Sequence, residues 1–475
     1  MTLKFTPAPF LKRKVAKLIY PNIMTDPIKT LTSSAIPGLS GEMMIPGDKS
    51  ISHRSLILGG MATGRTRVSG LLMGADVLST LEAVRALGVN ITRDTEDNII
   101  IDGVGTGGFI SPQAALDLGN AGTGVRLLMG AVAGQPVTAT FTGDASLSKR
   151  PMKRITDPLC EMGAQIAYDP AGAEKGFLPV TISGAQPPLP IRYEMAVASA
   201  QIKSAILFAA LNARGQTIIT EPHLSRDHSE AMLNHFGVAL EREMLADGRH
   251  RITLEGEAEL QAKDIIVPRD PSSAAFAMVA ALITKNSHIT LPGISLNPQR
   301  TGLIITLQEM GGNIEIVNER IEGGEAVGDI IVQSSQLKGI AVPATRSASM
   351  IDEYPILSVA AACADGETYM PGVAELRVKE TDRISVMAEG LKACGVEVSE
   401  TPDSMRVIGA GTISGGARLA SQHDHRIAMS FLVLGMVAQH PITMLDVATI
   451  STSFPDFANI MNKAGAQLEE GITQA

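Results

Sequence analysis

AILFAALNARGQTIITEP (205–222) predicts an apolar helix, a glycine turn and a short β strand, in that order. The same arrangement occurs six times, and the other copies begin at residues 55, 126, 275, 355 and 429. Ala, Leu and Met dominate the helical part of the copies, and β-branched residues are frequent after the turn. Recurrence of one pattern indicates a fold assembled from repeats of a single supersecondary unit.

A second helix, amphipathic and ending at a glycine, follows the strand in each copy. The glycines concerned are Gly88, Gly163, Gly237, Gly311, Gly395 and Gly465. Glycine is favoured just beyond a helix because it adopts a positive φ without a steric penalty. A strand follows the glycine, as in residues 314–317, and most copies add another. We therefore expect a βαβαββ unit.

The repeats fall into two groups of three, which predicts two similar α/β domains. Pro-Arg-Asp-Pro (268–271) and Pro46-Gly47 are the expected crossings between them. The first domain then covers residues 47–268, and the second covers residues 39–46 plus 269–475. A solenoid is the alternative, but solenoid repeats do not usually carry a different charged motif each.

Residues 1–38 are expected to form a basic N-terminal extension. They contain six Lys or Arg and one acid, Asp26, with no periodic pattern beyond FLKRKVAKLIY. Ser is sparse before Ser33 and no secretory apolar region is present, so a targeting peptide is the less favoured interpretation. We expect a frayed, nonessential segment.

The composition favours a soluble, cytoplasmic protein that binds small anions. No apolar run approaches the roughly 20 residues that a membrane span needs. The cysteines Cys160, Cys363 and Cys394 lie far apart, which suggests neither a disulfide framework nor a zinc site. The net charge of −9 argues against a nucleic-acid partner. An anionic ligand then requires a local cluster of cations.

Polar motifs precede most of the expected helices, where unpaired N–H groups and the helix dipole favour an anion. Ser, Thr and Asp are ordinary caps at such positions. Lys and Arg are unfavourable beside the positive end of a helix unless an anion holds them. The cations in such positions are Lys49, Arg54, Arg126, Arg150, Arg226, Lys379, Arg383 and Arg426. We expect them to line an anion-binding cleft between the domains.

Six segments, taken together and in order, resemble the signature motifs of the 5-enolpyruvylshikimate-3-phosphate (EPSP) synthase family. They are PGDKSISHR (46–54), GNAGTGVR (119–126), KRPM (149–152), ASAQIKSA (198–205), RVKETDR (377–383) and DHRIAMSF (424–431). The resemblance runs from Gly41 to Phe457, and IDEYPIL (351–357) with the Ser-Ala-Gln triplet (199–201) resembles the bacterial class II branch. It implies two inverse α/β domains of three βαβαββ repeats each.

The resemblance also implies a reaction. The enolpyruvyl group of phosphoenolpyruvate (PEP) passes to the 5-hydroxyl of shikimate 3-phosphate, in the shikimate pathway to chorismate and the aromatic amino acids. The hydroxyl attacks C2 of PEP while C3 is protonated, and phosphate then leaves. Neither a metal nor another cofactor is implied, and we expect a monomer that binds these two substrates.

The family motifs assign contacts position by position. The residues expected to hold shikimate 3-phosphate are Lys49, Ser50, Arg54, Ser199, Ala200, Gln201, Arg226, Asp352 and Lys379. Those expected to hold PEP, whose carboxylate and phosphate suit paired guanidinium groups, are Lys49, Asn120, Gly122, Arg150, Gln201, Arg383 and Arg426.

Two carboxylates are expected to divide the proton transfers. The resemblance implies Asp352 as the base for the hydroxyl and Glu380 as the acid at C3, with Lys49 assisting. For Glu380, the structural alternative is an ordinary carboxylate in the first turn of a helix.

Two positions depart from the family pattern, and one bears on inhibition. Glu375 stands where many members carry Asn, and Thr452 stands where many carry Lys, which removes one expected cation. In the family, Gly122 borders the PEP site, where the longer phosphonate glyphosate competes, and some tolerant members carry Ala there. The glycine of this chain therefore implies a site that admits glyphosate.

Two other functions stay open. The sister enzyme that transfers enolpyruvyl to UDP-N-acetylglucosamine typically carries a reactive cysteine in a mobile loop, whereas the three cysteines here lie in expected helices. A noncatalytic sensor of phosphorylated ligands would bind shikimate 3-phosphate without releasing phosphate when PEP is added.

Overall fold

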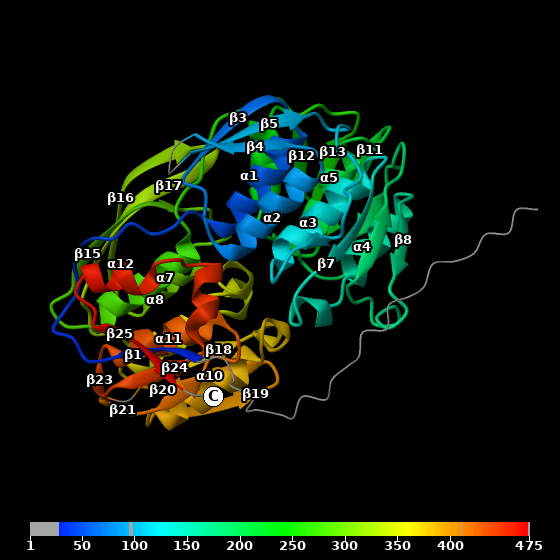
Figure 1. The fold of residues 1–475 in the computed structure, drawn as a ribbon. Helices are drawn as coiled ribbons and strands as arrows, with labels where there is room; N and C mark the ends of the chain where they lie inside the picture. The colour runs from blue at the N-terminus through cyan, green and yellow to red at the C-terminus, as the bar shows by residue number, and fades with distance from the viewer. Residues whose placement is uncertain (1–27, 95–97, 410, 474–475) are drawn as a thin grey trace, which may run out of the picture.

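Six sheets of three or four strands, each accompanied by two helices, correspond to the six predicted units (Figure 1). A further, two-stranded sheet pairs residues 413–415 with residues 438–440. The structure is a computed structural model that describes residues 28–94, 98–409 and 411–473. The predicted fold class, two inverse α/β domains of three repeats each, is confirmed.

In the first domain, the elements follow the expected βαβαββ order, except that the first unit takes its parallel strand, β14 (Ile265–Ile266), from the end of the domain. They are α1 (Lys49–Met61), β3 (Thr63–Ser69), α2 (Ala75–Ala86), β4 (Asn90–Arg93), β5 (Asn98–Val104), β6 (Leu116–Asp117), α3 (Gly122–Ala133), β7 (Thr138–Thr142), η1 (Leu147–Lys149), α4 (Lys153–Glu161), β8 (Gln165–Tyr168), β9 (Val180–Ser183), β10 (Arg192–Glu194), α5 (Ala200–Ala210), β11 (Gln216–Glu221), α6 (His228–His235), β12 (Leu240–Met244), β13 (His250–Glu255) and β14 (Ile265–Ile266).

The second domain repeats this order and adds two strands from the N-terminal part of the chain. Its elements are β1 (Ile28–Ser33), β2 (Ser40–Glu42), α7 (Pro271–Ile283), β15 (His288–Ser295), α8 (Gly302–Glu309), β16 (Asn313–Glu322), β17 (Glu325–Gln333), η2 (Ala344–Ser349), α9 (Tyr354–Ala362), β18 (Glu367–Pro371), η3 (Ala374–Val378), α10 (Arg383–Ala393), β19 (Glu397–Thr401), β20 (Ser404–Ile408), β21 (Ile413–Gly415), β22 (Arg418–Ala420), α11 (His425–Gly435), β23 (Ala438–His440), β24 (Ile442–Leu445), η4 (Val447–Thr452), α12 (Phe457–Lys463) and β25 (Leu468–Thr473).

The sheets share one pairing pattern. In sheets β14-β3-β5-β4, β6-β7-β9-β8, β10-β11-β13-β12, β16-β17-β15-β2 and β22-β24-β1-β25, one parallel pair adjoins two antiparallel pairs. The sheet β18-β20-β19 is antiparallel, and isolated parallel bridges extend it beside β18. The sheets lie toward the outside of each lobe, with the helices inside (Figure 1).

Glycine turns end the amphipathic helices as predicted. The six glycines at 88, 163, 237, 311, 395 and 465 all have φ between +86° and +116°. A side chain is strained in that region, so these positions favour glycine. Each turn lets the chain leave its helix and enter the next strand of the same sheet.

Two hydrophobic cores fill the two lobes. One extends from Ile51 to Val267, and the other combines residues 31–45 with residues 274–468. The apolar helices at the centre of each lobe, such as α3 and α7, are buried almost all round, as expected for helices without a polar face. Gly47 and Arg269 form an antiparallel bridge where the chain crosses between the cores.

The expectation of a frayed extension over residues 1–38 does not hold for its last part. Residues 28–33 form β1, which pairs antiparallel with both β24 and β25. In the other sheets this central position belongs to the last strand of the unit, so the N-terminal segment completes the sixth repeat. A short strand paired with segments far along the chain leaves no local signal in the sequence. Residues 1–27 lie outside the described residues.

Among the helices described, none combines the length and the apolar composition needed to cross a lipid bilayer.

Candidate active site

The residues assigned from the family motifs lie in the first turns of helices or just before them, except for Arg54 in the second turn of its helix. Lys49, Gly122, Ala200 and Arg383 are the first residues of α1, α3, α5 and α10, and Ser50, Arg54, Gln201 and Arg426 follow within α1, α5 and α11. Asn120, Arg150, Ser199, Arg226, Asp352, Lys379 and Glu380 lie just ahead of α3, α4, α5, α6, α9 and α10. Both domains contribute, so the site forms where the domains meet.

Asp352 lies among cations from both domains. Arg226 of the first domain donates from Nη2 to Oδ2 at 2.6 Å, and Arg383 of the second donates from Nη1 to Oδ1 at 3.3 Å. Lys379 Nζ lies 4.0 Å from Oδ1. Burial raises the pKa of Asp352, but these cations and Arg426 outweigh it and hold the pKa well below its usual range. Asp352 is therefore ionised, and it links the two domains.

Glu380 forms a second link across the domain boundary. Arg383 Nη2 donates to its Oε2 at 2.6 Å, and Arg150 Nη1 of the first domain lies 3.4 Å from its Oε1. Burial raises the pKa of Glu380, but Arg383 and then Arg150 lower it below the usual range. Arg383 itself is held by Asp424, the N-cap of α11, at 2.7 Å. One guanidinium thus contacts both proposed catalytic carboxylates.

A cluster of arginines surrounds the start of α3. Arg150 Nη2 donates to Asn120 Oδ1 at 3.1 Å, and Arg126 Nη1 donates to Gln201 Oε1 at 3.0 Å. A Cβ built on Gly122 would lie 3.0 Å from Arg150 Nη1 and 3.2 Å from Arg126 Nη1. The glycine therefore lets both guanidinium groups approach the helix start closely.

Lys49 and Arg54 are both held by protein groups. Lys49 Nζ forms an ion pair with Asp76. Arg54 is 2% exposed, and it donates to Ser229 Oγ, to Ser204 Oγ and to the backbone carbonyl of Ser50. Burial lowers the pKa of Arg54 to about 10, which leaves it charged near neutral pH.

Ser199 and Lys379, which are also expected to contact substrate, form hydrogen bonds or ion pairs within the protein, and Thr452 does the same. Ser199 caps α5, where its Oγ accepts a hydrogen bond from Ile202 N. Lys379 Nζ lies 2.6 Å from Glu375 Oε1, so the residue that replaces the usual Asn partly neutralises this lysine. Thr452 Oγ1 donates to the backbone carbonyl of Thr449 at 2.7 Å and supplies no cation.

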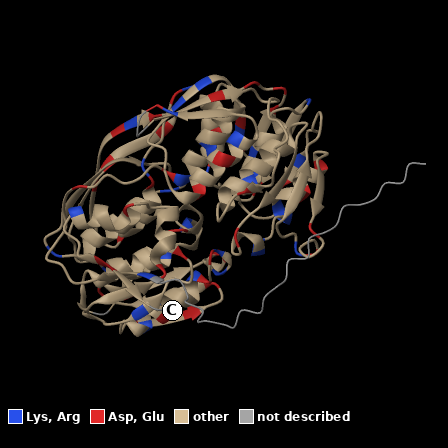
Figure 2. Ribbon diagram, viewed as in Figure 1, with Lys and Arg blue, Asp and Glu red and all other residues tan. Residues whose placement is uncertain are grey.

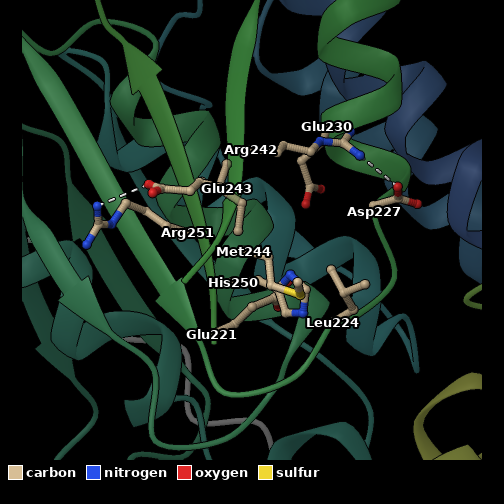
Figure 3. Close-up of a pocket in the computed structure, with 10 residues that line it drawn as sticks. Glu221, Leu224, Asp227, Glu230, Arg242, Glu243, Met244, His250 and Arg251 are labelled. Carbon is tan, nitrogen blue, oxygen red and sulfur yellow. Dashed lines mark hydrogen bonds and ion pairs between the residues drawn. The ribbon is translucent and has the colours of Figure 1, made fainter. Parts of the chain in front are cut away.

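A cavity of about 120 Å³ beside α6 is lined only by residues of the first domain (Figure 3). Next to it, the buried Lys203 Nζ lies 3.0 Å from Glu221 Oε1 and 2.7 Å from Glu230 Oε1. Lys203 also donates to the backbone carbonyl of Ser225 at 3.4 Å. Because Ser225 precedes Arg226, this buried cluster anchors the loop that carries Arg226 to Asp352.

Sequence reasoning assigned Arg126 to the cleft without a substrate, and it did not single out Arg154 or Asp76. Arg126 stood among the cations at helix starts but received no role from the motifs, although burial and the neighbouring arginines lower its pKa to about 9. Arg154 Nη2 lies 3.5 Å from Gln201 Oε1. Asp76 has no local signal, because its pairing with Lys49 depends on how α1 and α2 pack.

The arrangement suits two multiply charged anions. Charges of both signs occur where the lobes face each other (Figure 2). Arg126, Arg150, Arg226, Arg383 and Arg426 offer paired N–H donors, which match carboxylates and phosphates. Within the described parts of the chain, no group of three His, Cys, Asp or Glu side chains could hold a metal ion.

Comparison with known proteins identifies a family. A family model described as EPSP synthase (3-phosphoshikimate 1-carboxyvinyltransferase) matches residues 34–461. Two bacterial proteins named 3-phosphoshikimate 1-carboxyvinyltransferase are each 54% identical to the chain. The one from Paracoccus denitrificans aligns over 91% of this chain and 96% of its own length. The one from Cereibacter sphaeroides aligns over 94% and 99%.

Solved structures that resemble this chain include a member of the same family. An EPSP synthase from Acinetobacter baumannii superposes with a TM-score of 0.84 at 45% identity, covering 94% of this chain and 100% of that one. The enolpyruvyl transferase NikO from Streptomyces tendae gives a TM-score of 0.74 at 16% identity, again over 94% and 100%. At that identity, NikO shows a shared fold alone.

Proposed function

The chain belongs to the EPSP synthase family, and we propose that its interdomain site carries out that family's reaction. The enolpyruvyl group of PEP is transferred to the 5-hydroxyl of shikimate 3-phosphate, and phosphate is released. The protein is a transferase of the shikimate pathway to aromatic amino acids. The observation that carries the site assignment is the pair of ionic links across the domain boundary, Arg226–Asp352 and Arg150–Glu380.

PEP is assigned to the arginine cluster at the start of α3. Arg126 and Arg150 approach Gly122 from the first domain, and Arg383 reaches the same region through Glu380. Three guanidinium groups around one position provide donors for both the carboxylate and the phosphate of PEP. Asn120, Gln201, Lys49 and Arg426 complete this set.

Shikimate 3-phosphate is assigned to the neighbouring side of the site. Arg226 and Lys379 belong to different domains, and both lie near Asp352. The carboxylate of Asp352 can accept a hydrogen bond from the 5-hydroxyl. Ser199, Ala200 and Gln201 present the start of α5 to the same ligand. Lys49, Ser50 and Arg54 do so from α1, where Arg54 is the most deeply buried and acts partly by holding the Ser50 carbonyl.

The two carboxylates divide the proton transfers. Asp352 accepts the proton of the attacking hydroxyl while the hydroxyl oxygen bonds to C2 of PEP. Glu380 donates a proton to C3, takes one back from C3 in the elimination step, and phosphate leaves with the electrons of its bond to C2. Lys49 assists by balancing negative charge. Arg383 and Arg150 keep the pKa of Glu380 low. Glu380 therefore gains its proton only when the carboxylate and phosphate of PEP bind to the same arginines and offset their charge.

The comparisons favour this reaction over the sister transferase and over a noncatalytic sensor. The cysteines support the same choice. Burial raises the pKa of Cys363 to about 12 and that of Cys394 to about 11, and the pKa of Cys160 is also raised. A nucleophilic or acidic thiol near neutral pH needs a lowered pKa instead.

Three finer features are part of the proposal. The IDEYPIL segment and the Ser199-Ala200-Gln201 triplet support membership of the class II branch. We also propose a monomer, because the assigned contacts need no residue from a second chain. Cys160, Cys363 and Cys394 are free thiols, which supports a reducing, cytoplasmic location.

Phosphate release with both substrates tests the function. The wild type should release phosphate only when PEP and shikimate 3-phosphate are both present. Glu380→Gln and Asp352→Asn should keep the fold and lose about two or more orders of magnitude in turnover, the usual scale for a general acid or base. Binding of shikimate 3-phosphate with no phosphate release from the wild type would favour the sensor. Wild-type turnover in both variants would remove the carboxylate assignments.

A further inference from the structure

A buried arginine joins the first helix of each domain. Arg300, in the loop between β15 and α8, is 4% exposed. Its Nη1 donates to Asp48 Oδ2 at 2.8 Å, and its Nη2 donates to Asp270 Oδ1 at 2.9 Å. Asp48 is the N-cap of α1, and Asp270 is the N-cap of α7. Asp48 follows one crossing between the domains and Asp270 lies within the other, so Arg300 connects the domains where the chain passes between them.

The contacts continue from Arg300 into the interdomain site. Arg300 Nη2 also donates to Ser272 Oγ at 2.7 Å, and that hydroxyl donates to Glu353 Oε1. Glu353 Oε1 lies 3.5 Å from Arg426 Nη1. Asp48, Asp270, Ser272, Arg300 and Glu353 form what we call the Arg300 network. Lys49, which follows Asp48, stands at one end of it, and Arg426 stands at the other.

Stability alone does not explain this network. Asp48, Asp270 and Glu353 place three carboxylates, each less than 5% exposed, near one buried guanidinium. Burial raises the pKa of Asp48, but Arg300 and its other neighbours outweigh that and lower it to about 2, so the aspartate is ionised. Among the described residues, Arg300 Nε and Glu353 Oε2 are buried polar atoms without a hydrogen-bond partner. Incompletely satisfied buried ions are a poor source of stability, because desolvation offsets their attraction.

The network is instead suited to fixing geometry. Asp48 sets the start of α1 by accepting from Ile51 N at 2.8 Å, and Lys49 projects from that start. Glu353 and the Asp352 carbonyl both contact Arg426 Nη1, which restricts the direction of that guanidinium. Displacing reacting groups by about 1 Å is enough to slow a reaction by around a hundredfold.

We propose that Arg300 and Glu353 are positioning residues that hold Lys49 and Arg426, from opposite domains, at the separation that PEP requires. The inference rests on the proposed function, in which both cations contact PEP. Arg300 acts through Asp48 and Ser272, and Glu353 acts through Arg426. Because Lys49 contacts both substrates and Arg426 only PEP, a disturbed network affects PEP more than shikimate 3-phosphate.

The test compares conservative variants in the full-length protein. Arg300→Lys keeps the charge but loses the two-pronged geometry, and Glu353→Gln keeps the shape but loses the charge. Arg346→Lys and Glu309→Gln are matched controls, because Arg346 donates to both carboxylate oxygens of Glu309, at 2.6 and 2.7 Å, outside the site. Ser272→Ala removes the hydroxyl that links Arg300 to Glu353, and it replaces Arg300→Lys in the test if that variant does not fold.

The readouts are kcat, KM for each substrate, Tm, and the PEP dissociation constant measured by calorimetry without shikimate 3-phosphate, so that no turnover occurs. We expect network variants to weaken PEP binding or lower kcat by roughly ten- to hundredfold, with a smaller change in KM for shikimate 3-phosphate. The control variants should stay within about twofold of the wild type in kcat and in the PEP dissociation constant, even where their Tm falls. A double variant with Arg300→Lys and Glu353→Gln should lose little more activity or PEP affinity than the worse of the two single variants, because both residues act through one chain of contacts.

The outcomes separate this proposal from the proposed function. If the network variants bind PEP and turn over as the wild type does while only Tm falls, the network is structural and the proposal is overturned. A wild type that binds PEP but releases no phosphate would overturn the proposed reaction, and PEP affinity in the variants would still decide the positioning role. A wild type that does not bind PEP overturns both.

Discussion

Glu380 lies between two arginines that belong to different domains, Arg383 at 2.6 Å and Arg150 at 3.4 Å. Their charge keeps its pKa below the usual range, yet protonation of C3 requires the acid form. The carboxylate and phosphate of PEP bring negative charge to the same arginines, which raises the pKa of Glu380. We therefore expect PEP binding, measured without shikimate 3-phosphate so that no turnover occurs, to take up protons, and the uptake to grow as the pH falls toward the raised pKa of Glu380.

Calorimetry in buffers of different ionisation enthalpy measures this proton uptake. Glu380→Gln should show less uptake than the wild type, because the titrating group is gone. Glu309→Gln, in an ion pair outside the site, should match the wild type. Equal uptake in the wild type and in Glu380→Gln would assign the proton to the ligands instead.

Gly122 bears on inhibition through the space beside it. A methyl group there would lie 3.0 Å from Arg150 Nη1 and 3.2 Å from Arg126 Nη1, so both guanidinium groups would have to move. Glyphosate is longer than PEP and tolerates less intrusion. We expect Gly122→Ala to raise the glyphosate inhibition constant by roughly ten- to hundredfold, from about 1–3 kcal/mol of overpacking, and to raise KM for PEP less.

The measurement is glyphosate inhibition in competition with PEP. Gly107→Ala is the matched control, because a Cβ at residue 107 meets nothing within 4 Å. If the inhibition constants of the wild type and Gly122→Ala agree within about twofold, the methyl group does not obstruct the inhibitor.

At the scale of residues, the sequence predicts types better than partners. Arg150, Arg226 and Arg383 stand out because cations are unfavourable at a helix start without an anion. Their actual partners, Glu380, Asp352 and Asp424, depend on how helices from distant repeats meet. The pairing of Lys49 with Asp76 could not be predicted for the same reason, because it depends on how α1 and α2 pack.

At the scale of elements, β1 changes the expected role of the N-terminal segment. It lies between β24 and β25, and it pairs with both. Removing residues 1–33 leaves two strands without their central partner and exposes unpaired backbone groups. We expect that deletion to lower Tm and solubility markedly relative to a deletion of residues 1–27, which retains β1. Equal Tm for the two deletions would show that β1 contributes little.

The helices and most strands were predictable because their signals are local. A glycine at a positive φ ends each amphipathic helix, and the apolar helix before each turn needs no partner to be recognised. Strand β1 carries no such signal. Its sequence, IKTLTS, becomes a strand only because β24 and β25, far along the chain, provide edges on both sides.

At the scale of the whole molecule, two cores meet at a charged boundary. The cores are separate in sequence, apart from the N-terminal strands that join the second core. The repeat count predicts this division, but it does not predict which charges face each other across it. That information arises only when the Arg300 network and the crossings set the orientation of the domains.

Domain closure follows from that boundary. Arg226–Asp352 and Arg150–Glu380 are the ion pairs that span it within the substrate site, at 2.6 and 3.4 Å, and helix starts from both domains bring positive charge to it. Shikimate 3-phosphate adds the negative charge that lets these helix starts approach, so we expect small-angle scattering to show a smaller radius of gyration when it is added. Without it, Asp352→Ala and high salt should each enlarge the radius, because one removes an interdomain ion pair and the other screens the partly exposed pairs. An unchanged radius at saturating shikimate 3-phosphate, in the wild type at low salt, would mean that the domains do not close on this substrate.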